Sequence, residues 1–156
     1  SPKENREVPP LDYDRVYRLK HANPGLEIVI NGGIASIEAA RLHLDAVDGV
    51  MLGRAAYQNP WSLAEVDARV FGGSAPLAAR ADAIRAYRPY VAAGLDAGTA
   101  LAALVKPVLG LFHGEPGGRI YRRVLSERGC RAGAGLDVLD DALAATERAP
   151  RRLAAA

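Results

Sequence analysis

The sequence has very little cysteine and no long apolar run. Cys130 is the single cysteine among 156 residues, so no disulfide can form within the chain, and this usage is typical of a cytoplasmic protein. No stretch approaches the roughly 20 apolar residues of a membrane-spanning helix. The polar start of the chain does not resemble a signal peptide. We therefore expect a cytoplasmic protein without a membrane partner.

A strong overall charge is also missing, because the formal net charge is only +2. The charge is unevenly distributed, however. Residues 1–78 carry 8 basic and 10 acidic side chains, whereas residues 79–156 carry 12 basic and 8 acidic ones. The second half is therefore the better candidate for an anionic partner. The three histidines, His21, His43 and His113, have no partner at metal-ligand spacing, so we expect no metal site.

The start of the sequence has the character of a loop inside a larger protein. The first residue is Ser1 rather than methionine, and residues 1–10 are polar, rich in proline and without periodicity. We expect this chain to be a fragment.

The first part of the sequence alternates helices with short apolar strands, and each strand ends in a glycine turn. The expected elements are a helix over 11–21, a strand over 26–30, a helix that Ser36 caps, a strand over 49–52 and a helical stretch over 55–58. This order is typical of parallel βα units. Two strands cannot make a stable parallel sheet, so we expect upstream sequence to supply the rest. A (β/α)8 barrel needs about 250 residues, and this chain has room for its last two units.

The first expected helix has a cap and an apolar face. Asp12 is placed to cap its N-terminus, and Val16, Leu19 and Tyr13 are expected to share one face.

The second part of the sequence has no strand signal. After a helix over 63–71 and a linker over 72–76, helices are expected over 79–93, 98–111, 119–127 and 136–148. Pro107 should kink or break the second of these four. We therefore predict an α/β fold class, with the last βα units of a barrel in residues 1–75 and a small all-helical domain in residues 76–156.

Two glycine turns carry the strongest local chemistry. Asn31-Gly32-Gly33 follows the first strand and exposes backbone N–H groups without Cβ interference. The following helix directs its N-terminal dipole to the same place. Gly53-Arg54 follows the second strand and adds a guanidinium, which matches phosphate oxygens. The pair of turns indicates a phosphate site, although glycines at such positions often serve only to turn the chain.

Several segments together resemble the A-type tRNA-dihydrouridine synthases. The resemblance covers nearly the whole chain, in order and with matching gaps. Its segments are Ser1 to Glu7, Ile30 to Gly33, Asp48 to Trp61, and Leu109 to Phe112 followed by Gly114, Pro116-Gly117, Arg119, Arg122-Arg123 and Leu125-Ser126. The run from Gly49 to Trp61 is far more specific than either glycine turn alone.

The resemblance implies a fold and an activity. Members of this family have an FMN-binding (β/α)8 barrel followed by a helical domain. They reduce uridines in the tRNA D-loop to 5,6-dihydrouridine and use NADPH to recharge the flavin. A-type members act on U20 and U20a. The expected cofactors are thus FMN and NADPH, and the expected partner is tRNA.

The resemblance also implies roles for residues of this sequence. The residues expected to hold the FMN phosphate are Asn31, Gly32, Gly33, Gly53 and Arg54. Lys3 and Arg6 match tRNA-contacting positions in a loop after an earlier barrel strand. Arg119 and Arg122 match a second pair of tRNA contacts on the helical domain.

The spacing of Arg119 and Arg122 also supports this second pair of tRNA contacts. Arg119 and Arg122 are three positions apart, so a helix presents them side by side. Cationic faces of this kind bind RNA backbones. Arg123 extends the patch, but we interpret it as ordinary surface.

No catalytic residue is expected in this chain. The resemblance places the catalytic cysteine, and the lysine and histidine that contact the flavin, in barrel loops that would lie upstream of Ser1. Cys130 lies in the helical region and cannot replace the catalytic one. Tyr121 stands where these enzymes often carry tryptophan, which keeps an aromatic ring.

Two alternative functions remain open at this point. The first is a non-catalytic RNA-binding module, and the second is part of another FMN-dependent barrel oxidoreductase. The second explains the two glycine turns but not the arginines near residue 119. We also expect a fragment of this kind to be inactive and poorly stable alone, because two barrel strands leave open edges and an unpaired apolar face.

Overall fold

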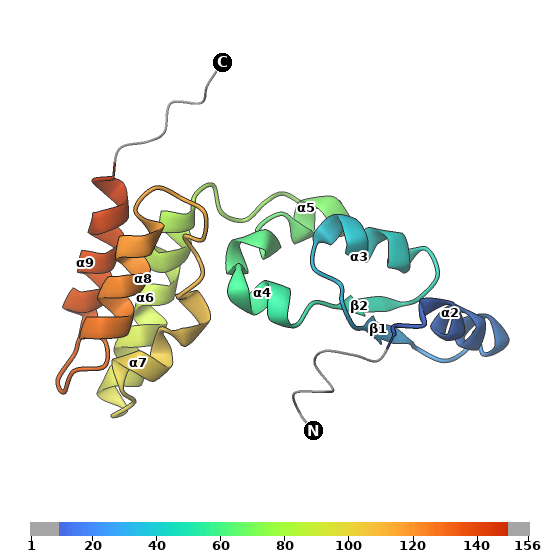
Figure 1. Ribbon diagram of the computed structural model, residues 1–156, viewed down its shortest axis with the longest axis horizontal. Helices are drawn as coiled ribbons and strands as arrows, with labels where there is room; N and C mark the ends of the chain where they lie inside the picture. The colour runs from blue at the N-terminus through green and yellow to red at the C-terminus, as the bar shows by residue number, and fades with distance from the viewer. Residues whose placement is uncertain (1–9, 150–156) are drawn as a thin grey trace, which may run out of the picture. The chain divides into compact units, whose positions relative to one another are not determined.

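The computed structural model of the chain describes residues 10–149, and those residues are mostly helical with one small sheet (Figure 1). The chain divides into two compact units, Ser1–Ala55 and Ala56–Ala156. The α/β fold class is confirmed. No helix in the described part of the chain is both long enough and apolar enough to cross a membrane.

The described residues of the first unit, 10–55, form two strands and two helices. Its elements are α2 (Tyr13–Ala22), β1 (Val29–Asn31), α3 (Ile37–Leu44) and β2 (Gly49–Met51), and α4 (Arg54–Gln58) begins at its end. The strands are parallel, with Val29 opposite Gly49 and Asn31 opposite Met51. The sequence prediction of a parallel βα pair is therefore confirmed.

A side chain caps the N-terminus of both α2 and α3, as the sequence predicts. The Asp12 carboxylate accepts the Arg15 N–H at 2.9 Å, and the Ser36 hydroxyl accepts the Ala39 N–H at 3.1 Å. Each cap satisfies a backbone donor that the first helical turn leaves without a partner.

One face of the sheet packs and the other is exposed. Ile30 is buried in a cluster with Ile34, Ala40 and Val47. On the opposite face Val29 and Met51 keep 55% and 46% of their surface exposed. Only one side of each strand is thus covered within this unit.

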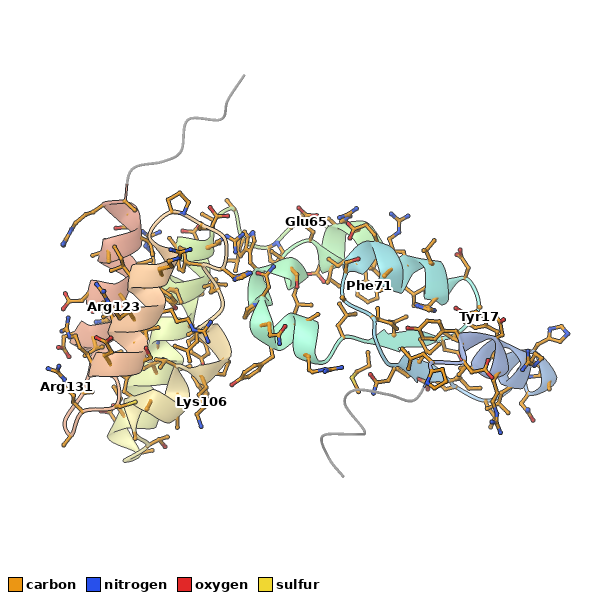
Figure 2. All side chains as sticks on the ribbon, in the orientation of Figure 1. Tyr17, Glu65, Phe71, Lys106, Arg123 and Arg131 are labelled. Carbon is orange, nitrogen blue, oxygen red and sulfur yellow. The ribbon has the colours of Figure 1, made fainter. Side chains whose placement is uncertain are left out.

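The packed face of α2 differs from the expected one. Tyr13, Val16 and Tyr17 pack against the cluster around Ile30, whereas Leu19 is exposed. Tyr17 takes the inner position because its hydroxyl shares a hydrogen bond of 2.5 Å with Nδ1 of the buried His43 on α3 (Figure 2).

The second unit is helical. Its elements are the 3-10 turn η1 (Pro60–Leu63), α5 (Val66–Val70), α6 (Arg80–Asp96), α7 (Leu101–Leu104), the 3-10 turn η2 (Lys106–Val108), α8 (Gly118–Arg128) and α9 (Leu136–Glu147). Helices α6, α8 and α9 lie side by side (Figure 1). Their shared core includes Tyr121, Leu125 and Leu139, which are fully buried.

Some of these helices differ from their predicted limits, and the helix expected over 63–71 is reduced to α5. Helix α6 continues through Gly94 to Asp96, because Gly94 gives room to α7: a Cβ at this position would lie 2.5 Å from Leu104 Cδ2. The helix expected over 98–111 is interrupted, as predicted from Pro107, and becomes α7 followed by η2.

The boundary between the compact units falls between Ala55 and Ala56. The sequence predicts a domain boundary between residues 75 and 76, within the linker over 72–76. Residues 56–75 belong to the second unit because Trp61 packs against its core. Gly110 also lies so close to the Gln58 carbonyl oxygen that a Cβ would be 2.1 Å from it. The roles assigned to the two segments stay predictions.

Candidate functional site

The two glycine turns lie at the same edge of the sheet. Because β1 and β2 are parallel and Asn31 pairs with Met51, both strands end at this edge. Gly32 follows Asn31 directly, and Gly53 comes two residues after Met51. Loops that leave the carboxyl ends of parallel strands are where α/β folds bind ligands.

The first turn requires glycine because of its backbone conformation. Gly32 has φ +126° and Gly33 has φ +66°, and side-chain-bearing residues rarely adopt such values. A Cβ at Gly32 would also lie 2.6 Å from Leu11 Cδ2, and a Cβ at Gly33 would lie 2.6 Å from Leu11 Cδ1. These methyl groups end a flexible side chain, so the backbone conformation is the stronger constraint.

A tyrosine on α2 holds this turn. The Tyr13 hydroxyl donates a hydrogen bond of 2.6 Å to the Gly32 carbonyl oxygen across 19 positions of sequence. The Tyr13 ring in turn meets His43 edge-on, with 4.5 Å between the ring centroids. The turn is thus connected to both helices of the unit.

The second turn is less constrained. A Cβ at Gly53 would meet only Met51 Sδ, at 3.7 Å, so neither space nor a positive φ requires glycine there. Arg54 is exposed at the start of α4 and forms no hydrogen bond or ion pair with the residues that the structure describes. Its guanidinium is available to an anion.

Ser36 does not add a ligand to this edge. Its hydroxyl accepts the Ala39 N–H and is used by the helix itself, and Glu38 lies in the first turn of α3. The groups available for a phosphate are therefore the backbone amides of the first turn and the Arg54 side chain. Lys3 and Arg6 lie outside the described residues.

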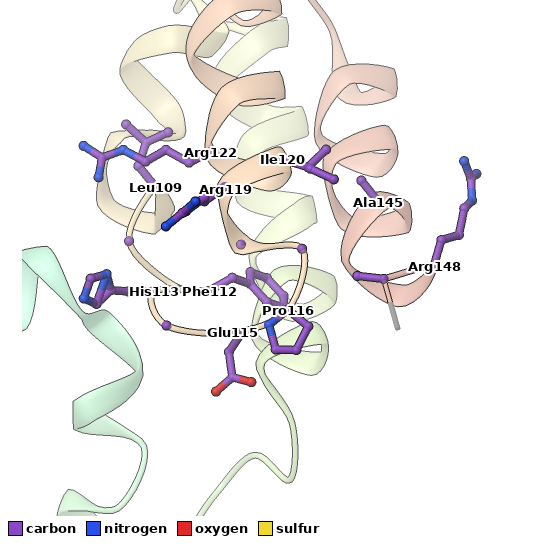
Figure 3. Close-up of a pocket in the computed structure, with 15 residues that line it drawn as sticks. Leu109, Phe112, His113, Glu115, Pro116, Arg119, Ile120, Arg122, Ala145 and Arg148 are labelled. Atoms are coloured by element: carbon purple, nitrogen blue, oxygen red, sulfur yellow. The ribbon is translucent and has the colours of Figure 1, made fainter. Parts of the chain in front are cut away.

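The second candidate site is a groove in the helical unit. Arg119 and Arg122 extend from α8 into a groove of about 1080 Å³, whose other walls are the loop 109–118 and the end of α9 around Ala145 and Arg148 (Figure 3). Both arginines are exposed. The prediction that a helix presents them side by side is confirmed.

Two glycines set where α8 begins. Gly117 has φ +77° and is the residue before the helix. A Cβ at Gly118 would lie 2.0 Å from the Phe112 carbonyl oxygen, a distance that only a backbone shift would relieve. The loop and α8 therefore meet at a contact that only glycine permits, and Arg119 follows it directly.

Arg80 fixes the loop from the other side. Its guanidinium donates to the Leu111 carbonyl oxygen at 2.6 Å and to the Glu115 carboxylate at 3.0 Å. It also lies 5.4 Å from the centroid of the Trp61 ring, a favourable cation–π distance. Glu115 is an acidic residue that lines the groove, so this ion pair neutralises a charge that would repel an anion.

The arginines of the second unit form two sets. One set is ion-paired: Arg69 with Glu65, Arg80 with Glu115, Arg85 with Asp82 and Glu147, Arg88 with Asp140, and Arg128 with Asp137 and Asp141. The other set makes no ion pair with any carboxylate of residues 10–149, and its members are Arg119, Arg122 and Arg123 on α8 together with Arg131 and Arg148. Arg123 is exposed on α8 (Figure 2). The unpaired set is concentrated on α8.

Sequence reasoning missed two residues of these sites. Arg80 reaches Leu111 across 31 positions and Tyr13 reaches Gly32 across 19, and no local pattern marks such contacts. Tyr13 carried a partial signal, since it falls on the inner face of the first helix. No cluster of three or more metal-binding side chains occurs within the part of the chain that the structure describes.

A family model and the similar proteins of known name indicate the same protein family. The family model described as "Dihydrouridine synthase (Dus)" matches residues 1–147. A "tRNA-dihydrouridine(20/20a) synthase" of Xanthomonas campestris is 55% identical over 155 residues, which are 99% of this chain and 46% of that protein. The proteins of the same name from Vibrio cholerae and Xylella fastidiosa are 51% and 52% identical, over 92% and 94% of this chain and 44% and 43% of their own lengths. The chain spans about half the length of the curated relatives it matches.

Proposed function

This chain belongs to the dihydrouridine synthase family, and from that membership we propose that it supplies the flavin-phosphate turns and a tRNA-binding surface of a tRNA-dihydrouridine synthase. The proposed reaction is the reduction of uridine in the D-loop to 5,6-dihydrouridine, at the U20 and U20a positions that its relatives' names specify. The proposed cofactors are FMN and NADPH, and the substrate tRNA makes the cytoplasm the proposed location.

The first turn fits the phosphate of FMN. Consecutive backbone amides in a turn with positive φ form a concave anion site, and Gly32 and Gly33 supply such a turn at the ends of parallel strands. We propose that Asn31 and Gly53 complete the walls and that Arg54 supplies the positive charge. When bound, FMN would supply the redox chemistry, while these residues bind its phosphate and orient it.

The exposed side of the sheet supports the proposed barrel. Val29 and Met51 expose apolar side chains on the face opposite the packed helices, which is the face that points into the interior of a (β/α)8 barrel. We propose that residues 1–75 are the last βα units of such a barrel, that residues 76–156 are its helical tRNA-binding domain, and that the catalytic cysteine is supplied from outside this chain.

The unpaired arginines of the groove are the observation that carries the tRNA proposal. Arg119 and Arg122 lie on one face of α8 without a carboxylate partner among the described residues. Five other arginines of the same unit are neutralised by ion pairs. Exposed guanidinium groups that no carboxylate neutralises are suited to phosphate oxygens of RNA. We propose that Lys3 and Arg6 add a second contact.

A matched pair of double variants tests this site. In the complete gene product, Arg119→Ala/Arg122→Ala and Arg85→Ala/Arg88→Ala remove the same number of positive charges. Fluorescence anisotropy with labelled tRNA should show about a tenfold or greater loss of affinity for the first pair and little loss for the second. Equal losses would mean that the total charge, and not the groove, attracts the RNA, and the proposed site would be wrong.

The activity itself requires a separate measurement. The complete gene product is incubated with unmodified tRNA, FMN and NADPH, and the nucleosides are then analysed by mass spectrometry. The expected result is dihydrouridine in place of uridine in the D-loop. Absence of dihydrouridine, with tRNA binding intact, would contradict the enzymatic proposal.

One observation favours the alternative of an RNA-binding module. The groove is built entirely from residues 109–149 of the second unit, so a contact with RNA at this groove would not involve the flavin turns. Binding of tRNA without any FMN affinity or dihydrouridine formation would support this alternative.

A further inference from the structure

Tyr13 makes the one side-chain hydrogen bond to the flavin-phosphate turn within the part of the chain that the structure describes. Its hydroxyl donates to the Gly32 carbonyl oxygen at 2.6 Å. The residue that accepts has φ +126° and is followed by a second glycine with φ +66°. Two consecutive glycines can adopt many backbone conformations. A hydrogen bond to the peptide between them therefore selects one conformation of the turn.

The anchored carbonyl determines the direction of an amide. The Gly32 carbonyl and the Gly33 N–H belong to the same planar peptide unit, and no described peptide bond is cis. In a trans peptide these two groups point in opposite directions. A hydroxyl that holds the carbonyl on the α2 side therefore directs the Gly33 N–H away from α2.

The Tyr13 ring also contacts α3. Its ring meets His43 edge-on at 4.5 Å, with an angle of 66° between the rings. His43 is buried, and its Nδ1 shares the hydrogen bond with the Tyr17 hydroxyl. Two tyrosines one helical turn apart on α2 thus contact the same histidine of α3, but only Tyr13 reaches the turn.

We propose that Tyr13 is a positioning residue, which holds the Gly32–Gly33 peptide so that the Gly33 N–H faces the phosphate of the flavin cofactor. This inference rests on the proposed function of the turn. It extends the phosphate site to a side chain that does not touch the ligand and that acts through the backbone.

The test uses Tyr13→Phe in the complete gene product, with Tyr17→Phe as the control. Both variants keep the ring and remove one hydroxyl from the same helix, but only the first removes a bond to the turn. Dissociation constants are measured for FMN and for riboflavin, which lacks the phosphate, by quenching of flavin fluorescence. Tyr13→Phe should weaken FMN binding about tenfold, the value of one hydrogen bond. Riboflavin binding to Tyr13→Phe should stay unchanged. Tyr17→Phe should bind both FMN and riboflavin with wild-type affinity.

The outcomes separate this inference from the proposed function. A wild-type protein that binds neither flavin overturns the proposed function and the inference with it. Wild-type FMN affinity in Tyr13→Phe overturns the inference and leaves the flavin site standing. An equal loss of FMN and riboflavin also overturns it, because the effect would then not involve the phosphate.

A second measurement does not need the flavin. Backbone NMR relaxation should show a lower order parameter for the Gly33 amide in Tyr13→Phe than in the wild type or Tyr17→Phe. Identical order parameters in all three proteins would overturn the positioning role.

Discussion

Arg88 of α6 and Asp140 of α9 form a bidentate ion pair, with Nε 2.9 Å from Oδ1 and Nη2 3.0 Å from Oδ2. A second pair between the same helices joins Arg85 Nη2 to Glu147 Oε1 at 2.6 Å. Two charged contacts therefore join α6 to α9 above a core that contains Val91 and Leu139. The planar guanidinium matches the carboxylate in a single orientation, so the first pair also fixes the register of the helices.

Acid should weaken this contact. The hydrogen bonds from Arg88 hold the pKa of Asp140 below its ordinary value of 3.8. A lowered pKa in the folded state means that the stabilisation is present above the unfolded value of about 3.9 and is lost as the pH falls through the folded one. Both side chains are about half exposed, so we expect Asp140→Asn to cost only about 0.5–1 kcal/mol near neutral pH and to remove this acid dependence. Urea unfolding over a pH series, with Glu127→Gln as an exposed control on α8, measures both effects.

Alkaline pH should act through Tyr121. Its side chain has no exposed surface, its hydroxyl donates to the Val108 carbonyl oxygen at 3.2 Å, and burial raises its pKa. The stabilisation is complete below the unfolded pKa of about 10 and is lost as the pH rises towards the folded value. Tyr121→Phe should cost about 1 kcal/mol near neutral pH and flatten the alkaline decline. A decline of equal steepness in the variant would contradict this prediction.

Gly118 should tolerate no side chain. An alanine Cβ would meet the Phe112 carbonyl oxygen at 2.0 Å, so the start of α8 or the loop must move, at about 1–3 kcal/mol. Gly114→Ala in the same loop meets no atom within 4 Å but has φ +80°, and we expect about 1–2 kcal/mol from the backbone conformation alone. Urea unfolding compares the stabilities. Only Gly118→Ala should also weaken tRNA binding, because Arg119 follows the displaced residue.

Arg80 should influence RNA binding through Glu115. Arg80→Ala removes the partner of a carboxylate that lines the groove, and the released negative charge should lower tRNA affinity several-fold. Glu115→Ala in the same background should restore most of that loss. A double-mutant cycle of dissociation constants measures the coupling, and additive effects would show that the two residues act independently.

Ser36 should matter for the fold of the first unit. Ser36→Ala removes the cap of α3 and should cost about 1 kcal/mol of unfolding free energy. Ser74→Ala, in an exposed segment between helices, is the control and should leave stability unchanged. A change of similar size in both variants would contradict the capping role.

Local signals predicted much of the fold. The caps Asp12 and Ser36, the interruption at Pro107 and the limits of α8 and α9 within one residue follow from residue types at nearby positions. Such features depend on contacts within a few residues, which a sequence displays directly.

Features that depend on distant residues were not predictable in this way. The strand expected from Leu26 begins only at Val29, because the Lys20 ammonium group binds the carbonyl oxygens of Pro24 and Leu26. The Asp48 carboxylate, paired with the same Lys20 at 2.8 Å, accepts the Ile28 N–H. These side chains take up backbone groups that a longer strand would use.

The same distinction applies to the candidate sites. The glycine turns and the arginines of α8 were predictable, since a turn needs particular residue types and a helix places residues three apart together. Tyr13 and Arg80 were not, because each acts on a carbonyl far away in sequence. The resemblance to a family identified the residues proposed to touch ligands more readily than those that hold them in position.

The separation of paired and unpaired arginines has a consequence for how the second unit can change over generations. A substitution of Arg119 or Arg122 alters what the groove attracts and removes no ion pair to the described residues, whereas a substitution of Arg88 loosens the packing of helices. Selection can therefore adjust the proposed affinity for RNA through α8 without changing the ion pairs between α6 and α9. Binding strength and thermal tolerance would then evolve along largely independent routes within one small bundle.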